Sequence, residues 1–252
     1  MAGGKAPAIF GMAFETISGI VLKYTNYRDN DRILSLLTRD RGLVSVTARA
    51  CRKQNSALAA VCEPCCYGEF VVYGRGTVLY VSNATLLESF YPIREDYDKF
   101  ASAMQIAHMT QMLAYNRLSI EDLFTLCYHA LTFIAYGEQN PIDIELCFAV
   151  KLLKLAGYEP TLTNCVSCGK DLRRKTDIYF SKAQGGAMCD YCGAGCRSVS
   201  ALSLEAIRRM LLLPLPDMGK VRLPERVRNE LDTVIYDYAE YVFEQTIKLR
   251  GR

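Results

Sequence analysis

The pattern of hydrophobic and polar residues changes partway along the chain. Between Ile17 and about Leu87, apolar residues recur mainly at every second position, as in residues 20–25 and again in residues 44–48. A period of two is typical of a strand with one buried face. Shorter apolar runs, which we interpret as further strands, lie at residues 33–37, 70–73 and 78–81.

Two connections suggest how these five predicted strands are joined. Residues 56–61 are rich in alanine and predict one or two helical turns between the third and fourth strands, and Gly74-Arg75-Gly76 predicts a hairpin between the last two. Five short strands with a helix between the third and the fourth are typical of an OB-fold barrel. An SH3-like barrel fits the same pattern and stays open as an alternative.

After Pro92 the apolar period becomes helical, with Ile106, Met109 and Leu113 at positions i, i+3 and i+7. We expect further helices after the N-cap residue Ser119, over residues 143–156, from Ser203, and from about Pro224. The predicted fold class is therefore α+β. A five-stranded OB-fold barrel in residues 1–85 is followed by a helical domain in residues 86–252.

The composition supports a folded protein with two modest domains. The chain has 252 residues, of which 50% are hydrophobic and 23% are charged. The most apolar stretch, residues 126–136, is far too short to span a bilayer. The first residues lack the basic-then-apolar order of a secretion signal. We therefore expect a cytoplasmic protein with no membrane partner.

The net charge of +3 hides an uneven distribution. Residues 1–80 hold ten Lys and Arg against six Asp and Glu, whereas residues 81–160 hold five against ten. Residues 161–200 are basic again, with six against three. This asymmetry favours an anionic partner, such as a polyanion.

Four cysteines form the clearest motif in the chain. Cys165 and Cys168 make one C-x2-C pair, Cys189 and Cys192 make a second, and a glycine follows each pair. Two such pairs at this spacing are typical of a zinc site, and four thiolates would leave no open position for catalysis. The sequence thus predicts one structural zinc ion in a module of residues 163–198. The glycines are expected to adopt the positive φ that closes each turn.

Other interpretations of the cysteines stay open. A disulfide or a set of free thiols is an alternative for the two pairs, although the chain has 11 cysteines, an odd number. Cys196 could replace one zinc ligand. The cluster Cys62, Cys65 and Cys66 contains Pro64 and has no second pair, which favours buried thiols there.

No catalytic motif accompanies these features. The sequence contains no G-x-S-x-G elbow, no H-E-x-x-H and no phosphate-binding loop. Both histidines, His108 and His129, lie in apolar helical stretches and fit packing better than acid–base chemistry. We interpret the chain as a binding protein without a small-molecule substrate.

Basic residues gather where OB-folds hold oligonucleotides, on strands two and three and in the loops between strands one and two and between strands four and five. Lys and Arg neutralise phosphates there, and Tyr27 and Tyr73 offer rings on which bases can stack. The predicted DNA-binding residues are Arg28, Arg39, Arg41, Arg49, Arg52, Lys53 and Arg75, with a second cluster at Arg173, Arg174 and Lys175.

Two stretches resemble the bacterial recombination mediator family RecO. The first comprises Asp31-Arg-Ile-Leu-Ser-Leu-Leu-Thr38, Arg41-Gly-Leu43 and Ala48-Arg-Ala-Cys-Arg-Lys53; the second runs from Leu146 through Lys151-Leu-Leu-Lys-Leu-Ala-Gly-Tyr-Glu-Pro160 into the cysteine pairs. The resemblance extends from about Ile17 to the last helix. One departure is Ala50, where the family commonly has glycine.

The resemblance implies a function that composition and spacing alone do not give. Members of this family have an OB domain and a helical domain, often with a zinc module, and they bind single- and double-stranded DNA and anneal complementary strands. They contact the tail of single-stranded DNA-binding protein and act with RecR to help RecA load. The resemblance implies no catalytic residue.

Two rival hypotheses come from other functional classes. One is a zinc-stabilised adaptor that binds only protein, in which the arginines serve solubility. The other is a hydrolase whose zinc keeps an open position, which requires ligands other than four cysteines. Binding to single-stranded DNA tests the first hypothesis, and metal coordination spectroscopy tests the second.

Overall fold

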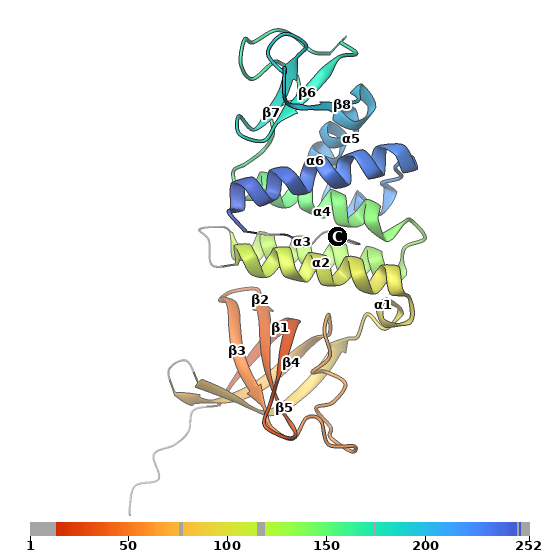
Figure 1. Cartoon of the computed structure of the whole chain (residues 1–252). Coiled ribbons are helices and arrows are strands. Elements are labelled where there is room, and N and C mark those ends of the chain that lie inside the picture. Colours follow the sequence, from red (N-terminus) through yellow and green to blue (C-terminus); the bar gives the residue numbers. More distant parts are fainter. Residues whose placement is uncertain (1–13, 76–77, 115–118, 174, 246, 248–252) are drawn as a thin grey trace, which may run out of the picture. The chain divides into compact units, whose positions relative to one another are not determined.

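The computed structural model describes residues 14–75, 78–114, 119–173, 175–245 and 247 (Figure 1). These residues form two compact units. One unit holds the described residues up to Thr38 together with Val44–Ser89. The other holds the short segment Arg39–Leu43 and the described residues from Phe90 onward.

The first unit is a closed five-stranded barrel with the strand order β1-β2-β3-β5-β4. β1 pairs antiparallel with both β2 and β4, β4 pairs antiparallel with β5, and β3 runs parallel to β5. This arrangement confirms the predicted OB-type barrel. The strands are β1 (Phe14–Tyr27), β2 (Asp31–Thr38), β3 (Gly42–Ala48), β4 (Tyr67–Arg75) and β5 (Val78–Glu88).

The barrel interior explains the alternating sequence pattern. Inward-facing residues such as Ile17, Leu34, Val46 and Phe70 are almost completely buried and form one core. Residues between them in the strands keep more exposure, as expected for strands that bury one face. Outward positions include exposed apolar residues such as Phe14 of β1 and Val78 of β5.

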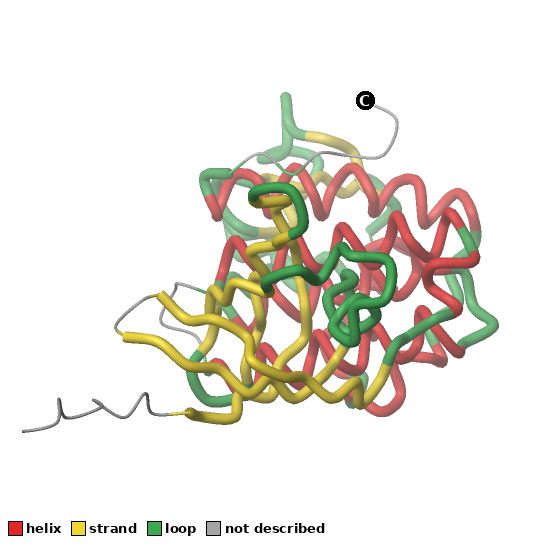
Figure 2. Tube along the Cα trace, turned by 90° about the horizontal axis from the view of Figure 1, so that it is seen from below, coloured by secondary structure: helices red, strands yellow, loops and turns green. Residues whose placement is uncertain are grey.

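The connection between β3 and β4 differs from the predicted helix. Residues 49–66 form consecutive turns, drawn as loop in Figure 2. The Ser56 hydroxyl accepts a hydrogen bond from the Leu58 N–H at 3.3 Å, a local contact that competes with helical pairing. The Cys62 N–H donates to the Leu58 carbonyl at 3.2 Å, as in one helical turn, and the Ala59 N–H donates to the Ser56 carbonyl at 3.1 Å. The predicted one or two helical turns at residues 56–61 are thus present as isolated turns rather than a continuous helix, and Val61 and Cys62 pack into the barrel core.

The second unit is built from helices. α4 packs against α2, α3, α5 and α6, and the 3₁₀ helix η1 packs against α3 and α4. The helices are α1 (Pro92–Glu95), α2 (Tyr97–Leu113), α3 (Ile120–Tyr136), α4 (Pro141–Leu155), α5 (Ala201–Leu212), η1 (Leu215–Lys220) and α6 (Glu225–Phe243). Among the described residues, no helix is long and apolar enough to cross a membrane.

Two buried carboxylates join α4 to the carboxyl-terminal part of the chain. Asp143 is 1% exposed and accepts hydrogen bonds from the Arg228 guanidinium at 2.7 Å and from the Leu223 N–H at 3.1 Å. Glu145 accepts a hydrogen bond from the Tyr236 hydroxyl. Because each buried carboxylate has a hydrogen-bonding partner, Asp143 and Glu145 can be buried where α4 packs against the carboxyl-terminal part of the chain.

A small sheet lies between α4 and α5 along the chain. Its strands β6 (Ile178–Ser181), β7 (Gly186–Cys189) and β8 (Arg197–Val199) are antiparallel in the order β7-β6-β8. The sheet follows the first cysteine pair, and β7 ends on Cys189 of the second pair. The sheet therefore belongs to the cysteine-bearing segment.

Candidate nucleic-acid interface and metal centre

A cleft on the barrel brings two of the predicted arginines together. It has a volume of about 330 Å³, and Arg28 and Arg49 both line it. The Arg49 guanidinium carbon lies 4.1 Å from the ring centroid of Tyr80, and that of Arg28 lies 5.1 Å from the ring centroid of Tyr27. The remaining lining residues are Asp31, Ile33, Ser45, Thr47, Val78 and Leu79.

Two left-handed residues shape the edge of this cleft. Arg28 has a φ of 52° in the turn between β1 and β2, and Ala50 has a φ of 53° just after β3. The Ala50 N–H donates to the Asp31 carboxylate at 2.8 Å. Arg52 donates from its guanidinium to the Asp29 carbonyl at 3.1 Å. These bonds link the start of the connection between β3 and β4 to the β1–β2 turn. The backbone next to Arg28 and Arg49 is therefore held in place by hydrogen bonds.

Arg52 and Lys53 are exposed in the same connection, although neither lines the cleft. The guanidinium of Arg52 is partly committed to the Asp29 carbonyl. The backbone N–H of Lys53 donates to the Ala50 carbonyl at 3.2 Å, which closes a tight turn and leaves the Lys53 side chain exposed. Both cations therefore add charge next to the cleft.

Arg39 and Arg41 belong to a different part of the structure. Their turn, Arg39–Leu43, groups with the helical unit. Arg39 lies 3.6 Å from Glu121, and its guanidinium carbon is 5.8 Å from the Phe124 ring centroid. Arg41 lies 3.4 Å from Asp40. Both side chains are exposed, so these ion pairs are screened by water and compatible with exchange for a phosphate.

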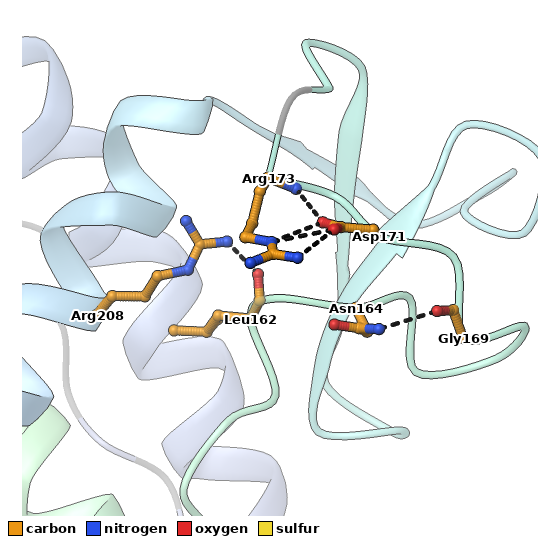
Figure 3. A network of polar contacts seen from close by, with 6 residues as sticks. All are labelled: Leu162, Asn164, Gly169, Asp171, Arg173 and Arg208. Atoms are coloured by element: carbon orange, nitrogen blue, oxygen red, sulfur yellow. Dashed lines mark hydrogen bonds and ion pairs between the residues drawn. The ribbon is translucent and has the colours of Figure 1, made fainter.

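The second predicted basic cluster is only partly described. Arg173 makes a two-pronged ion pair with Asp171, with a shortest contact of 2.6 Å (Figure 3). This pairing raises the pKa of Arg173, and it offsets the charge that the side chain could offer an anion. Lys175 is exposed. Arg174 and the side chain of Arg75 lie outside the described residues.

The four cysteines of the two C-x2-C pairs come together. The sulfur atoms of Cys165, Cys168, Cys189 and Cys192 all lie within 4.8 Å of one another, and those of Cys168 and Cys189 are 3.7 Å apart. A tetrahedral zinc with Zn–S bonds of about 2.3 Å requires sulfur–sulfur edges of about 3.8 Å. The donor set and its spacing thus fit a metal ion that prefers thiolates.

The two cysteine turns share a backbone pattern but use glycine differently. The N–H of Gly169 donates to the Cys165 carbonyl, and that of Gly193 donates to the Cys189 carbonyl, each at 2.8 Å. Gly169 has a φ of +76°, as predicted. Gly193 is not in the left-handed region, which corrects the prediction. A Cβ at Gly193 would lie 2.5 Å from Tyr179, so close packing is what requires glycine there.

The cysteine cluster also favours negative charge. Burial opposes ionisation of Cys165, but backbone N–H groups of Cys168, Cys189 and Ser167 outweigh it and lower the pKa of this thiol to about 6. Hydrogen bonding from the Cys192 backbone lowers the pKa of Cys189. A hydrogen bond with Ser167 lowers the pKa of Cys192, but Cys189, burial and Cys168 outweigh it and raise this pKa to about 12. Thiolates in one small space repel one another in this way unless a cation lies among them. The electrostatics therefore agree with the geometry.

The side chains around the cysteine cluster are held by local polar contacts. The Asn164 amide donates to the Gly169 carbonyl at 3.0 Å, which braces the first turn (Figure 3). The Arg208 guanidinium of α5 donates to the Leu162 carbonyl just before that turn. These bonds anchor the cysteine-bearing segment to the helical unit.

The remaining predicted thiols stay apart from this cluster. Cys196 lies outside the four-cysteine group, and its sulfur is 3.8 Å from that of Met188. Cys62, Cys65 and Cys66 are each at most 1% exposed in the barrel, and burial raises the pKa of Cys62. Buried thiols of this kind are unreactive and pack as small apolar groups.

A groove of about 340 Å³ lies in the helical unit, between α5, η1 and the start of α6. Its floor is apolar and includes Met210 and Val227, whereas Arg209, Lys220 and Arg222 contribute cations to its lining. The groove could not be predicted from the sequence, because its walls come from three elements that are brought together only by folding. Tyr80 was missed in the same way, since its partner Arg49 lies just after β3, 31 positions earlier in the chain.

Comparison with known proteins gives a consistent result over both units. Residues 12–90 match the family described as Recombination protein O N terminal, and residues 94–250 match Recombination protein O C terminal. The two matches together cover most of the chain and place no large segment outside the family.

Curated relatives extend the match to full-length proteins. The chain is 30% identical over 240 residues to DNA repair protein RecO of Desulforamulus reducens, covering 94% of this chain and 93% of that protein. It is 33% identical over 223 residues to the RecO of Rubrobacter xylanophilus, covering 86% and 89%. With the RecO of Caldicellulosiruptor saccharolyticus it shares 27% identity over 241 residues, covering 94% and 97%. The chain belongs to the recombination protein O family, RecO.

Proposed function

We propose that this protein is a DNA-binding recombination mediator without catalytic activity of its own. It binds and anneals single-stranded DNA and helps load the recombinase during DNA repair and homologous recombination, in the bacterial cytoplasm at the nucleoid. Family membership supports the repair and recombination role. The single observation that carries DNA binding is the barrel cleft, where two exposed arginines stand beside tyrosine rings.

The cleft supplies the two kinds of contact that single strands need. Guanidinium groups neutralise phosphates, and tyrosine rings receive bases irrespective of sequence. The predicted basic residues outside the cleft are proposed as further contacts for single- or double-stranded DNA. The proposed contacts are Arg28, Arg39, Arg41, Arg49, Arg52, Lys53, Arg75, Arg173, Arg174 and Lys175.

The cysteine cluster would hold one structural zinc ion. Four thiolates from Cys165, Cys168, Cys189 and Cys192 complete a tetrahedral coordination, so no position stays open for water or substrate. The chemistry that such an ion supplies is structural: it clamps the two turns together. This proposal disfavours the hydrolase hypothesis, which needs an open zinc.

We propose two protein partners, which the resemblance to the family implies: RecR and the acidic tail of single-stranded DNA-binding protein. Charge complementarity favours the groove between α5 and α6 for the tail, because Arg209, Lys220 and Arg222 line it among apolar residues. Glu205 lines it too, but this carboxylate is paired with Arg209 at 3.0 Å. Lys220 is paired with Asp217 at 2.6 Å, whereas the Arg222 guanidinium donates only to backbone carbonyls at 2.7 and 2.8 Å among the contacts described. Arg222 is therefore the cation best placed to meet a carboxylate.

DNA binding can be assigned to the cleft with two matched double variants. Replacing Arg28 and Arg49 by alanine should weaken binding to all single-stranded sequences, because two phosphate contacts are lost. The slope of log affinity against log salt should flatten by about 1.4, at roughly 0.7 per contact. Fluorescence anisotropy with labelled oligonucleotides over a salt series measures both quantities. Arg39→Ala with Arg41→Ala tests in parallel whether the β2–β3 turn shares the path.

A charge-matched control separates a specific surface from general attraction. Lys154 and Lys182 are exposed in the helical unit, and replacing both by alanine removes the same two charges. This control should leave the salt slope within about 0.3 of the parent. Equal losses in all three double variants would contradict the cleft, and parent protein that binds no DNA would favour the adaptor hypothesis instead.

A further inference from the structure

A row of aromatic side chains crosses the barrel beside the cleft. Phe14 of β1 is paired in register with Tyr73 of β4, and Tyr73 is paired with Tyr80 of β5. The ring centroids are 5.7 Å apart at both steps. Tyr80 also pairs with Thr47 of β3, so the row ends at the wall of the cleft, where Arg49 lies over the Tyr80 ring.

These rings are presented to the surface. Phe14 is 62% exposed, and Tyr73 and Tyr80 are half-buried on strands whose opposite face forms the core. The ring planes are inclined to one another by 49° and 31°, so none of the three is covered by a parallel neighbour. Cross-strand packing accounts for the contacts between the rings. Arg49 lies over the Tyr80 ring, so a base that stacks on Tyr80 would displace this guanidinium toward a phosphate.

The chemistry next to the row is suited to nucleic acid. Arg28 and Arg49 stand at the end of the row nearest the cleft. The one carboxylate that lines the cleft in the described part of the chain, Asp31, is engaged by the Ala50 N–H. A strand of phosphates held by the arginines would have its bases within reach of π-faces rather than acidic groups.

We propose that the row Phe14, Tyr73 and Tyr80 is a stacking track for the bases of single-stranded DNA. This inference rests on the proposed DNA-binding function. It sets the path of the strand, which leaves the cleft and crosses β5, β4 and β1 in that order. The barrel then uses two elements for two tasks: the arginines hold phosphates, and the aromatic row holds bases.

The track gives the barrel a reason to prefer single strands. In a duplex the bases are stacked on one another and their faces are not available, whereas in a single strand they can be splayed onto protein rings. The arginines contact phosphates in both forms. Loss of the row should therefore reduce binding of single strands and leave duplex binding unchanged.

A fluorescent reporter can be placed on the track, because the chain contains no tryptophan. In full-length Tyr73→Trp, titration with an oligothymidine strand should quench the indole, since the base stacks on it. An abasic strand of the same length should bind with much less quenching. The control Tyr97→Trp places the indole on α2, at a residue that is 84% exposed, and its emission should not respond. Binding without quenching at residue 73 would overturn the proposal.

Affinities give an independent readout. Tyr73→Ala should weaken binding of oligothymidine by roughly fivefold or more, as for other base–ring contacts, without changing the affinity for the abasic strand or the salt slope. Tyr73→Phe should restore the parent affinity. Equal affinities of parent and Tyr73→Ala would show that the row only packs the sheet.

The two proposals fail differently. If the proposed function is wrong, the parent binds neither the natural nor the abasic strand. If only the track is wrong, the parent binds both strands and Tyr73→Ala matches it. Should Tyr73→Ala lose the barrel fold, as judged by circular dichroism, the quenching of Tyr73→Trp decides the question by itself.

Discussion

Ala50 has a backbone conformation that glycine adopts more easily than alanine. Its φ of 53° lies in the left-handed region, which an L side chain with a Cβ adopts with strain and which glycine adopts freely. This backbone conformation agrees with the glycine expected here from the family resemblance. The hydrogen bond from the Ala50 N–H to Asp31 holds the turn in spite of the strain.

Replacing Ala50 by glycine should therefore stabilise the barrel. Relief of the left-handed strain is worth about 1–2 kcal/mol, and the greater freedom of glycine in the unfolded chain takes back about 0.5–1 kcal/mol. We expect a net increase of about 0.5–1 kcal/mol in the free energy of unfolding, measured by urea denaturation. Ala50→Val is the matched opposite and should be less stable than the parent. A glycine variant no more stable than the parent would show that the turn is unstrained.

At the same scale, sequence could identify residue types but not always their reason. The four cysteines and their spacing carried enough information to predict the cluster. The glycine after each pair did not: Gly169 needs its positive φ, whereas Gly193 makes room for Tyr179, which is 14 positions earlier in the chain. Packing between distant residues leaves no local pattern.

At the scale of elements, the start of a helix was predictable where only one candidate N-cap residue lay near it. Ser119 caps α3 by accepting from the Asp122 N–H, as predicted. α5 was predicted to begin at Ser203, but its cap is Ser200, which accepts from the Ser203 N–H. Both serines donate to Glu230 of α6. The second serine misled the prediction because the tertiary contact that uses it is invisible in the sequence.

The small sheet between α4 and α5 should depend on the metal. Its strands have three or four residues each, too few for a stable sheet alone. Cys168→Ser should release zinc and expose residues 178–199 to hydrogen exchange, while the barrel stays folded. Zinc contributes on the order of 10 kcal/mol in small zinc peptides, and less where a larger domain supports the site.

Metal content and hydrogen exchange of the reduced protein check this prediction together. Cys196→Ser is the matched control, because Cys196 lies outside the cluster, and it should keep one zinc per chain. A parent protein without stoichiometric metal, or disulfides among the four cysteines, would refute the zinc site.

At the scale of the whole molecule, the change of period near Pro92 separates two units with different tasks. We propose that residues 1–85 act as the DNA-binding domain and residues 86–252 as the helical domain, with the zinc module at residues 163–198. Strand β5 continues to Glu88, so a fragment that ends at Ser89 keeps the whole strand. The sequence could not show that Arg39–Leu43 groups with the helices, because that depends on contacts across many residues.

Separate units should allow two ligands at once. The cleft lies in the barrel unit and the groove lies in the helical unit, so DNA and an acidic tail peptide should bind the same molecule together. Arg222→Glu should weaken a labelled tail peptide by tenfold or more, through like-charge repulsion, and leave DNA affinity unchanged. Anisotropy with two dyes measures both. Arg226→Glu is the charge-matched control, and competition between the two ligands would contradict separate sites.

The position of α4 has a consequence for how the protein folds during its synthesis on the ribosome. This helix packs against α2 and α3, which are made before it, and against α5 and α6, which are made after it. Ten of its 15 residues are buried, including Asp143, whose ion-pair partner Arg228 is 85 positions later. During synthesis, one side of α4 therefore has no cover, and the Asp143 carboxylate has no counter-charge, until α6 has emerged. Completion of this helical packing therefore waits for α6, about 85 residues after α4 begins.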